Sequence, residues 1–372
     1  MKNRWIIGGV ITLGCLSAYF MLRNDKPKDN EIKIAINLPL SGPVASFSGG
    51  FPNGLKMGVS AGCSKYNVSE KSFVFMVDDN KASPSDSSTI FRRHGVNGYD
   101  AYVVGTTESA EAVLPNLGIN NDIPVFLVAF DAFMAKKGEN RFRLLPNFKT
   151  EVNTWLEFLD KTKPDRVATL TLNIPATQEQ FNTFIFPYLS KHKVETMRET
   201  FDFSTTTFRE IAMRIKKFHP DVVLISGYAF QLQMAVTALR ELDCLRENRV
   251  MTSIDLADFV DAGESLERFE GVVFSCPNVS FPIVEPEVEK WRGRFEKLYG
   301  KKPGYMEAFA YDTGLLLVKT YSNKGRVTPK DIIATTPMKG ITGNVLFDVG
   351  RDSISALSLA RIKNGTVIKF EE

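Results

Sequence analysis

The feature that most constrains the fold is a series of short, continuously apolar segments separated by amphipathic stretches. Strands buried on both faces are apolar at consecutive positions, as in a parallel sheet that is covered by helices. The first series therefore predicts βα units along the chain. The expected strands are 32–38, 73–77, 102–104 and 124–129, and the expected helices between them are 53–61, 86–94 and 109–117.

The same alternation starts again after Lys149. A helix that ends before Pro220 carries Ile211 and Ile215 on its apolar face. Two successive βα series predict an α/β fold of two doubly wound parallel-sheet lobes. Ligands of such sheets bind at the carboxyl ends of the strands, so the cleft between the lobes is the expected site. The other elements expected here are strands at 167–172, 222–225 and 250–252 and a helix at 231–242.

Composition narrows the class of protein. The 372 residues are 44% hydrophobic and 24% charged, as in an ordinary globular chain, and the formal net charge is +3. That excess is too small for the clustered basic face that binds nucleic acid, so no nucleic-acid partner is expected. The sequence has no GxxxxGK(S/T) loop, no HExxH, no CxxC and no GxSxG elbow. We therefore expect a protein that is not an enzyme and that holds no metal or cofactor.

Histidine and cysteine positions give no sign of a reactive centre. The histidines adjoin Arg, Lys and Pro and are expected at the surface; they are His94, His192 and His219. The cysteines of the body are odd in number and widely spaced, so we expect buried free thiols. They are Cys63, Cys244 and Cys276.

The amino end is expected to lie outside the fold. Residues 1–4 are a short basic start, 5–22 are apolar and uncharged, and 23–30 are a polar spacer. The uncharged run is long enough to cross ~30 Å of hydrocarbon as a helix. An uncleaved signal anchor, which tethers the body to the membrane outside the cytoplasm, is the favoured interpretation. A lipoprotein signal at Gly14-Cys15 and a cleaved, secreted form remain alternatives.

The start of the body, 34–47 (IAINLPLSGPVASF), followed by Asn53-Gly54, resembles the periplasmic branched-chain amino-acid-binding proteins. These are the type I solute receptors of ABC importers, in which a Leu-(Ser/Thr)-Gly-Pro turn precedes a helix that carries Asn-Gly. Four further segments agree in order, so that the resemblance spans nearly all of 31–372. They are 103–109 (VVGTTES), 207–227 with PDVV inside it, 304–317 with Tyr311-Asp312 inside it, and 339–348 (KGITGNVLFD).

The resemblance implies two lobes that are joined by three crossing strands and close around a small ligand. It implies an extracytoplasmic receptor that delivers an amino acid or related small molecule to an ABC permease. A sensing module of the same fold, which signals to a partner protein, is the alternative. The expected crossings are near Lys149, Cys276 and Gly350. The expected parts are an anchor or signal segment at 1–30, an amino-terminal lobe of 31–148 with 277–349, and a carboxy-terminal lobe of 149–276 with 350–372.

The resemblance also implies where the charged groups of a ligand bind. Ser109 matches the family's Ser that holds an α-carboxylate, at a helix start where N–H groups favour an anion. Ala129 matches a position whose carbonyl accepts the ligand ammonium. Asp131 stands where the family has Thr, and Glu108 adds a second negative charge. These two acids leave open a cationic or amide-like ligand.

The resemblance assigns the remaining positions as follows. Phe47 and Tyr228 match aromatic residues that line the cleft from the two lobes. Asp255 matches an acidic partner of the ammonium. Met306, with Tyr305, is expected either to form a wall of the side-chain pocket or to pack in the core. A buried zwitterion is tolerated only where both of its charges are matched in this way.

Overall fold

The computed structural model describes the chain from residue 31, with short gaps. Asp131, Gly350 and the apolar segment 5–22 lie outside the described residues, as does the side chain of Phe47. Within the described residues, no helix combines the length and the hydropathy needed to cross a bilayer. The described residues are 31–42, 44–117, 122–129, 133–136, 138–146, 148–244, 249–348, 352–353 and 357–371.

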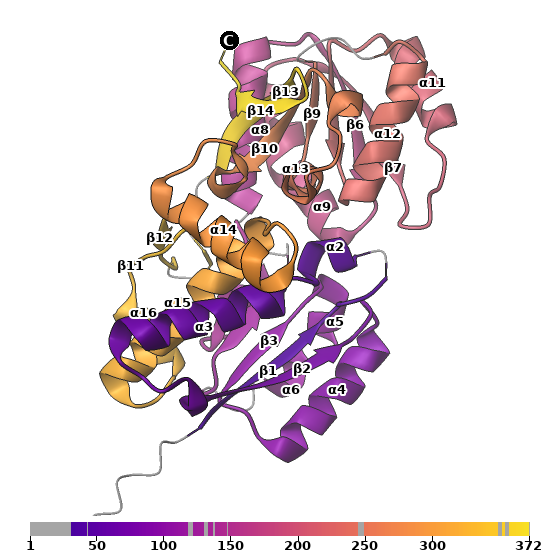
Figure 1. Ribbon diagram of the computed structural model, residues 1–372. Helices are drawn as coiled ribbons and strands as arrows, with labels where there is room; N and C mark the ends of the chain where they lie inside the picture. The colour runs from indigo at the N-terminus through magenta and orange to yellow at the C-terminus, as the bar shows by residue number, and fades with distance from the viewer. Residues whose placement is uncertain are drawn as a thin grey trace, which may run out of the picture.

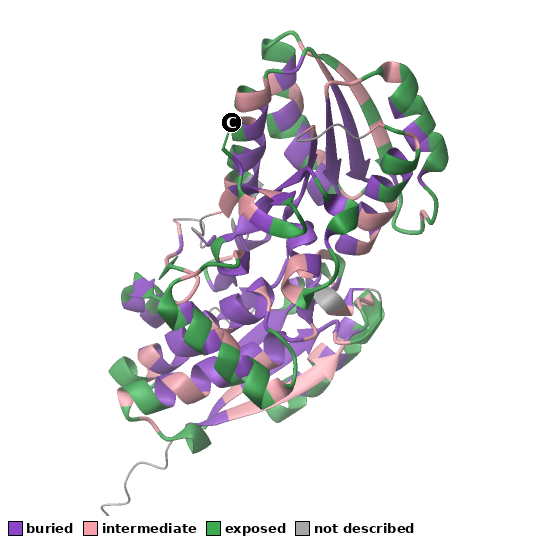
Figure 2. Cartoon of the chain, turned by 45° about the horizontal axis from the view of Figure 1, so that its top comes forward, coloured by how far each residue is buried: buried purple, intermediate pink, exposed green. Residues whose placement is uncertain are grey.

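The first lobe is built on a five-stranded parallel sheet with the strand order β2-β1-β3-β4-β5, which is the lower sheet in Figure 1. The central strands are almost completely buried, whereas the edge strand β2 is mostly half-buried (Figure 2). Every strand expected in this part of the sequence is confirmed. The strands are β1 (Ile32–Leu38), β2 (Phe73–Asp79), β3 (Ala101–Val104), β4 (Val125–Leu127) and β5 (Arg141–Arg143).

The second lobe contains a seven-stranded sheet with the order β14-β13-β10-β9-β8-β6-β7 (Figure 1). Strands β6 to β10 are all parallel to one another. Strands β13 and β14 form a hairpin that pairs antiparallel with β10 and makes one edge of the sheet. The three strands expected from the second series are confirmed. The strands are β6 (Arg166–Leu172), β7 (Glu195–Phe201), β8 (Val222–Ser226), β9 (Val250–Thr252), β10 (Val272–Pro277), β13 (Leu357–Lys363) and β14 (Thr366–Lys369). A separate two-stranded ribbon pairs β11 (Met338–Lys339) with β12 (Asn344–Val345).

After β10 the chain returns to the first lobe, where helix α15 packs against α3 (Figure 1). The helices of the first half are α2 (Ala45–Ser48), α3 (Phe51–Tyr66), α4 (Pro84–Asn97), α5 (Thr107–Glu111), α6 (Leu114–Leu117), α7 (Phe133–Lys136), α8 (Phe148–Thr162), α9 (Pro175–Gln180) and α10 (Phe186–Lys191). Those of the second half are α11 (Arg209–Phe218), α12 (Ala229–Glu241), α13 (Ala257–Ala262), α14 (Pro286–Tyr299), α15 (Tyr305–Lys324) and α16 (Pro329–Thr335). Single turns lie at η1 (Glu70–Ser72), η2 (Phe181–Ile185), η3 (Ile254–Leu256), η4 (Glu267–Phe269) and η5 (Asn278–Ser280).

Two motifs from the resemblance meet inside the first lobe. The Asp312 carboxylate in α15 accepts hydrogen bonds from the backbone N–H groups of Ile341 (2.8 Å) and Thr342 (2.9 Å) and from the Thr342 hydroxyl (2.6 Å). Gly340 is required there, because a Cβ would lie 2.3 Å from the Asp312 carboxylate. The two motifs therefore form one contact, although they are far apart in sequence.

Two expectations were wrong. The helix expected at 109–117 is two short helices, α5 and α6, because Pro115 has no N–H to donate and its ring disfavours a continuous helix. His94 was expected at the surface but is only 1% exposed. Its Nε2 lies 2.7 Å from Asp78 Oδ2, and its ring meets the Tyr102 ring edge-on. His192 and His219 are exposed as expected. The three cysteines of the body are free thiols as expected, with Cys244 only half-buried.

Candidate functional site

The carboxyl ends of the strands place the predicted residues at one end of each sheet. In the first lobe, Glu108 and Ser109 follow β3 and Ala129 follows β4. In the second lobe, Tyr228 follows β8 and Asp255 follows β9. The charge of Glu108 contributes to the raised pKa of Tyr228, after burial of the phenol, so Glu108 is near enough for its charge to act on Tyr228 across the lobes.

Ser109 is a buried hydroxyl without a hydrogen-bond partner among the described residues. Its backbone carbonyl accepts a hydrogen bond of 2.8 Å from the Ser87 hydroxyl, whereas its own Oγ contacts no donor or acceptor. A buried polar group left unpaired costs about 1–3 kcal/mol. The turn before it needs Gly105, since a Cβ there would lie 2.4 Å from the Val128 carbonyl oxygen. An added hydrogen-bonding group is expected to complete this position.

Ala129 lies next to a guanidinium, which the sequence did not indicate. Its carbonyl accepts a hydrogen bond of 3.1 Å from Arg143 Nη1. Arg143 is fully buried, and its Nε lies 2.6 Å from Asp352 Oδ1. One lone pair of the carbonyl remains, but the positive charge beside it opposes an ammonium group at that point.

The second lobe forms a small cavity at the ends of β6, β8 and β9, which we name the strand-end cavity. Its volume of about 30 Å³ is enough for one or two water-sized groups. Tyr228 and Asp255, which the resemblance assigned to the ligand site, both line it. The lining residues are Glu151, Leu172, Ile174, Thr177, Gln180, Ser226, Gly227, Tyr228, Ser253 and Asp255.

Asp255 is a buried carboxyl group on this wall, and its Oδ2 accepts a hydrogen bond of 2.9 Å from the Ser253 hydroxyl. Burial raises its pKa well above the usual range, and the charges of Asp258 and Glu151 raise it further. Tyr228 begins helix α12, where its N–H donates to Gln231 Oε1 at 3.2 Å. The cavity therefore combines a phenol with an acid whose charged form is disfavoured until a cation approaches.

Glu151 is the site residue that the sequence reasoning missed. Its Oε1 accepts a hydrogen bond of 2.8 Å from the Ile254 N–H, and its Oε2 accepts one of 3.1 Å from Gln180 Nε2. Burial raises its pKa, although these hydrogen bonds and the charge of Arg143 oppose the shift. Glu151 thus links the segments that follow β6 and β9. The signal that could have found it is helical spacing, because it shares a face of α8 with the buried Trp155.

Met306 lies in another cavity, of about 290 Å³, between α13 and the start of α15. Here Asp261 Oδ2 accepts hydrogen bonds from the Tyr305 N–H (2.8 Å) and from the Ser280 hydroxyl (3.1 Å). A carboxylate of the second lobe therefore caps a helix that packs in the first. Because Met306 is buried and does not line the strand-end cavity, the structure does not bring it together with Tyr228 and Asp255.

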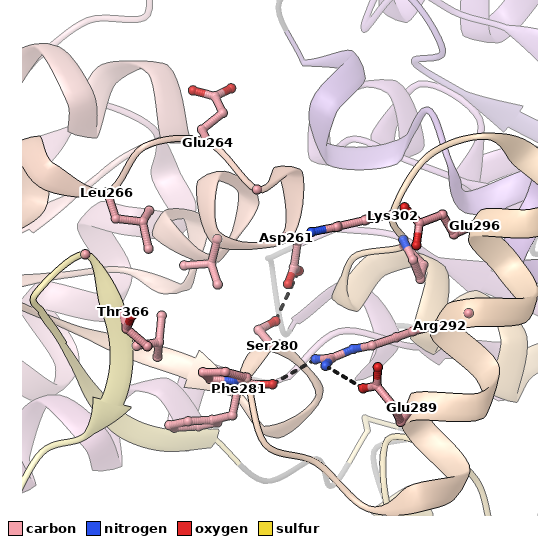
Figure 3. Close-up of a pocket in the computed structure, with 17 residues that line it drawn as sticks. Asp261, Glu264, Leu266, Ser280, Phe281, Glu289, Arg292, Glu296, Lys302 and Thr366 are labelled. Carbon is pink, nitrogen blue, oxygen red and sulfur yellow. Dashed lines mark hydrogen bonds and ion pairs between the residues drawn. The ribbon is translucent and has the colours of Figure 1, made fainter.

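A third cavity, of about 440 Å³, lies between α13, α14 and the β13–β14 hairpin (Figure 3). Arg292 crosses it, donating to the Phe281 carbonyl at 2.9 Å and lying 3.4 Å from a carboxylate oxygen of Glu289. The side chains around it carry both signs of charge, and none of them lines the strand-end cavity. This third cavity is therefore not part of the site at the strand ends.

Asp258 and Asp261 predict a pH-dependent stability. Burial raises the pKa of Asp261 to about 7, and burial together with the charge of Asp261 raises that of Asp258 to about 7. A carboxyl group with a raised pKa in the folded state stabilises the fold fully below its unfolded pKa, and this contribution is lost as the pH rises through the folded pKa. One pKa unit corresponds to about 1.4 kcal/mol, so for this partly exposed, interacting pair we expect a loss on the order of 3 kcal/mol between about pH 4 and pH 7.

Urea unfolding of the wild type and of an Asp258→Asn/Asp261→Asn double variant checks this. The stability of the wild type relative to the variant should fall as the pH rises through this range. Asp331→Asn is the matched control: burial raises the Asp331 pKa, but hydrogen bonds from Thr328 and Arg326 lower it overall. Its contribution should be constant above about pH 5. A difference between wild type and double variant that does not change with pH would contradict the prediction.

The fold matches solved structures over most of both chains. The branched-chain amino acid transporter substrate-binding protein LivJ of Streptococcus pneumoniae, in complex with isoleucine, has a TM-score of 0.77 at 17% identity and covers 91% of this chain and 100% of its own. A solute-binding protein of an ABC transporter from Rhodopseudomonas palustris BisB5, in complex with 3,4-dihydroxybenzoic acid, has a TM-score of 0.79 at 18% identity (92% and 96% covered). Another from R. palustris, in complex with benzoate, has a TM-score of 0.79 at 17% identity (91% and 95% covered).

At such low sequence identity, the structural likeness establishes the shared fold and no more. No curated protein sequence matches the chain. The sequence profile of periplasmic binding proteins, however, matches residues 31–359, which is most of the chain. The chain therefore belongs to the periplasmic binding protein family.

Proposed function

We propose that this protein is an extracytoplasmic solute receptor that closes around an amino acid or a related small molecule and delivers it to an ABC importer. The observation that carries the proposal is the pair of incomplete half-sites at the strand ends of the two lobes. One offers the buried, partnerless Ser109 hydroxyl, and the other offers the strand-end cavity with Tyr228 and Asp255. The solved relatives with isoleucine and benzoates, which share this fold, support the same role.

The proposal includes the lobe boundaries and the tether. The amino-terminal lobe would comprise 31–148 and 277–349, and the carboxy-terminal lobe 149–276 and 350–372. In support, strands β1 to β5 form one sheet, strands β6 to β10 with β13 and β14 form the other, and α15 returns to pack on α3. The segment 5–22 would hold the receptor at the outer face of the membrane.

Thermal unfolding with a ligand panel tests the receptor function. A ligand at ~100 times its Kd should add ~2.7 kcal/mol of stability, which raises the melting temperature by several degrees. The panel should include amino acids, amides, polyamines and benzoates. Ser109→Ala should weaken the binding of any ligand found by about tenfold, because it removes one hydrogen bond to a buried group.

Ser88→Ala is the matched control, since the Ser88 hydroxyl is exposed on α4 and donates to the Pro84 carbonyl of its own helix. It should leave the affinity unchanged. A folded protein that gains no stability from any member of the panel would count against a receptor of this ligand class.

A signalling role remains the second candidate, favoured by the length of the uncharged segment 5–22, which suits a fixed anchor. Ligand-stimulated ATP hydrolysis by the cognate permease in liposomes would support delivery. Its absence, with ligand binding intact, would favour a sensory partner instead.

A further inference from the structure

We propose that the ligand is an organic cation, whose charged group is received by Glu151 and Asp255 in the strand-end cavity. This inference rests on the receptor function proposed above. It goes beyond it by assigning the charge class of the ligand and by giving Glu151 a role in specificity.

The charged residues that line the strand-end cavity are all acidic. Of its lining residues, Glu151 and Asp255 are acidic and none is basic. Both are more than nine-tenths buried, at 5% and 6% exposure. Among the described residues, neither forms an ion pair. Buried charges are normally paired, so these two carboxyl groups can be charged together only where a positive charge comes from outside the chain.

The hydrogen bonds of Glu151 do not neutralise it. Its two oxygens accept from the Ile254 N–H and from Gln180, both of which are neutral donors. A carboxylate has about four lone-pair sites, so it can accept further donors from a ligand. Among the described residues of this wall, the side chain that donates to Asp255 is the Ser253 hydroxyl. Each acid therefore keeps some capacity to bind, and a cation in the cavity would favour its charged form.

The nearest cation of the chain is already engaged. Arg143 is close enough for its charge to lower the pKa of Glu151, but its Nε lies 2.6 Å from Asp352 and its Nη1 donates to the Ala129 carbonyl. Glu108 adds negative charge from the opposite lobe, within range of Tyr228. A ligand with a net negative charge would meet like charges from both sides, which costs binding energy.

Two further aromatic rings pack against Tyr228, which lines the cavity. Tyr228, on the cavity wall, lies edge-on to Phe203 with ring centroids 5.9 Å apart, and parallel to Phe230 at 6.5 Å. Phe203 is 47% exposed, so its ring is open to solvent. Ring faces attract ammonium and guanidinium-type cations, while carboxylates bind them directly. The acidic cavity wall and the aromatic rings beside it therefore both favour a cationic ligand.

The test uses pairs of compounds that match in shape and differ in charge. They are benzamidine with benzoate, choline with 3,3-dimethylbutanol, and leucinamide with leucine. Calorimetric titration of the purified protein should show the cation of at least one pair binding ten times or more tighter than its partner.

Glu151→Gln then tests the residue itself. The amide oxygen can still accept from the Ile254 N–H, and the amide can pair with Gln180 after that side chain flips, so the fold is expected to survive. The variant should weaken the cation by tenfold or more and bring the two members of the pair closer in affinity. Glu157→Gln is the matched control, because Glu157 is exposed on the same helix, and it should change neither affinity.

The outcomes separate the inference from the receptor function. Tighter binding of benzoate or leucine than of benzamidine or leucinamide would overturn the cation inference and leave the receptor function intact. A preferred cation whose affinity is unchanged by Glu151→Gln in a folded protein would overturn the role of Glu151. If none of the six compounds binds, the inference fails, and the wider panel above decides whether the receptor function fails with it.

Discussion

A Gly58→Val variant should lose most of its stability, by an expected 3 kcal/mol or more, because Gly58 lies where helices α3 and α15 touch backbone to backbone. A Cβ at this position would lie 2.0 Å from the Tyr311 carbonyl oxygen. The opposite helix has the same constraint, since a Cβ on Gly314 of α15 would lie 2.5 Å from the Leu55 carbonyl oxygen of α3. Overpacking a buried site costs about 1–3 kcal/mol even where side chains can move. Backbone atoms in two packed helices cannot move separately, so the cost here should exceed that range.

Urea unfolding of Gly58→Ala and Gly58→Val checks this prediction, and the first variant isolates the effect of the Cβ alone. Gly293→Ala is the matched control, because Gly293 is exposed in the middle of α14 and its Cβ would meet no atom within 4 Å. That variant should gain up to about 1 kcal/mol from the better helix propensity of alanine. Equal midpoints for Gly58→Ala and the wild type would show that the two helices can separate without loss.

The parts of the fold that were predicted from the sequence are those that helices cover on both faces. Strand β8 is completely buried, so its apolar side chains follow one another without a break. Strand β7 (ETMRETF) was missed because it is a largely exposed edge strand, in which polar side chains are permitted. Strand β5 was missed for a different reason. It is fully buried but carries Arg141 and Arg143, and buried arginines do not fit the pattern of an apolar strand.

The candidate site shows the same division. Tyr228 and Asp255 could be placed because both follow apolar strands directly, and the ends of parallel strands meet at one edge of a sheet. Glu151 could not, because it lies in helix α8 and its partner Ile254 is about a hundred residues away. Sequence periodicity gives local elements, whereas this contact depends on how α8 packs relative to the end of β9.

An Asp352→Asn variant should lose about 3–5 kcal/mol of stability, because it would leave the charge of Arg143 buried without its counter-ion. The two residues are 209 positions apart, and the Arg143 Nε lies 2.6 Å from Asp352 Oδ1. Both side chains are almost completely buried, at 0% and 4% exposure. A backbone hydrogen bond joins the same two segments, since the Ser353 N–H donates to the Arg143 carbonyl at 3.1 Å. The ion pair therefore ties strand β5 of the first lobe to the residues that precede β13 of the seven-stranded sheet.

Chemical denaturation at neutral pH measures the effect, with Glu241→Gln as the control. Glu241 lies 3.9 Å from Arg209, and both side chains are more than 60% exposed, so its loss should cost less than about 1 kcal/mol. An Arg143→Met/Asp352→Leu double variant should recover much of the stability, because replacing both partners of a buried pair removes the uncompensated charge. If Asp352→Asn costs no more than Glu241→Gln, the guanidinium must be neutralised in another way. Glu151, whose raised pKa is opposed by the charge of Arg143, would then be its counter-ion, and the strand-end cavity would hold one carboxyl group available to a cation instead of two.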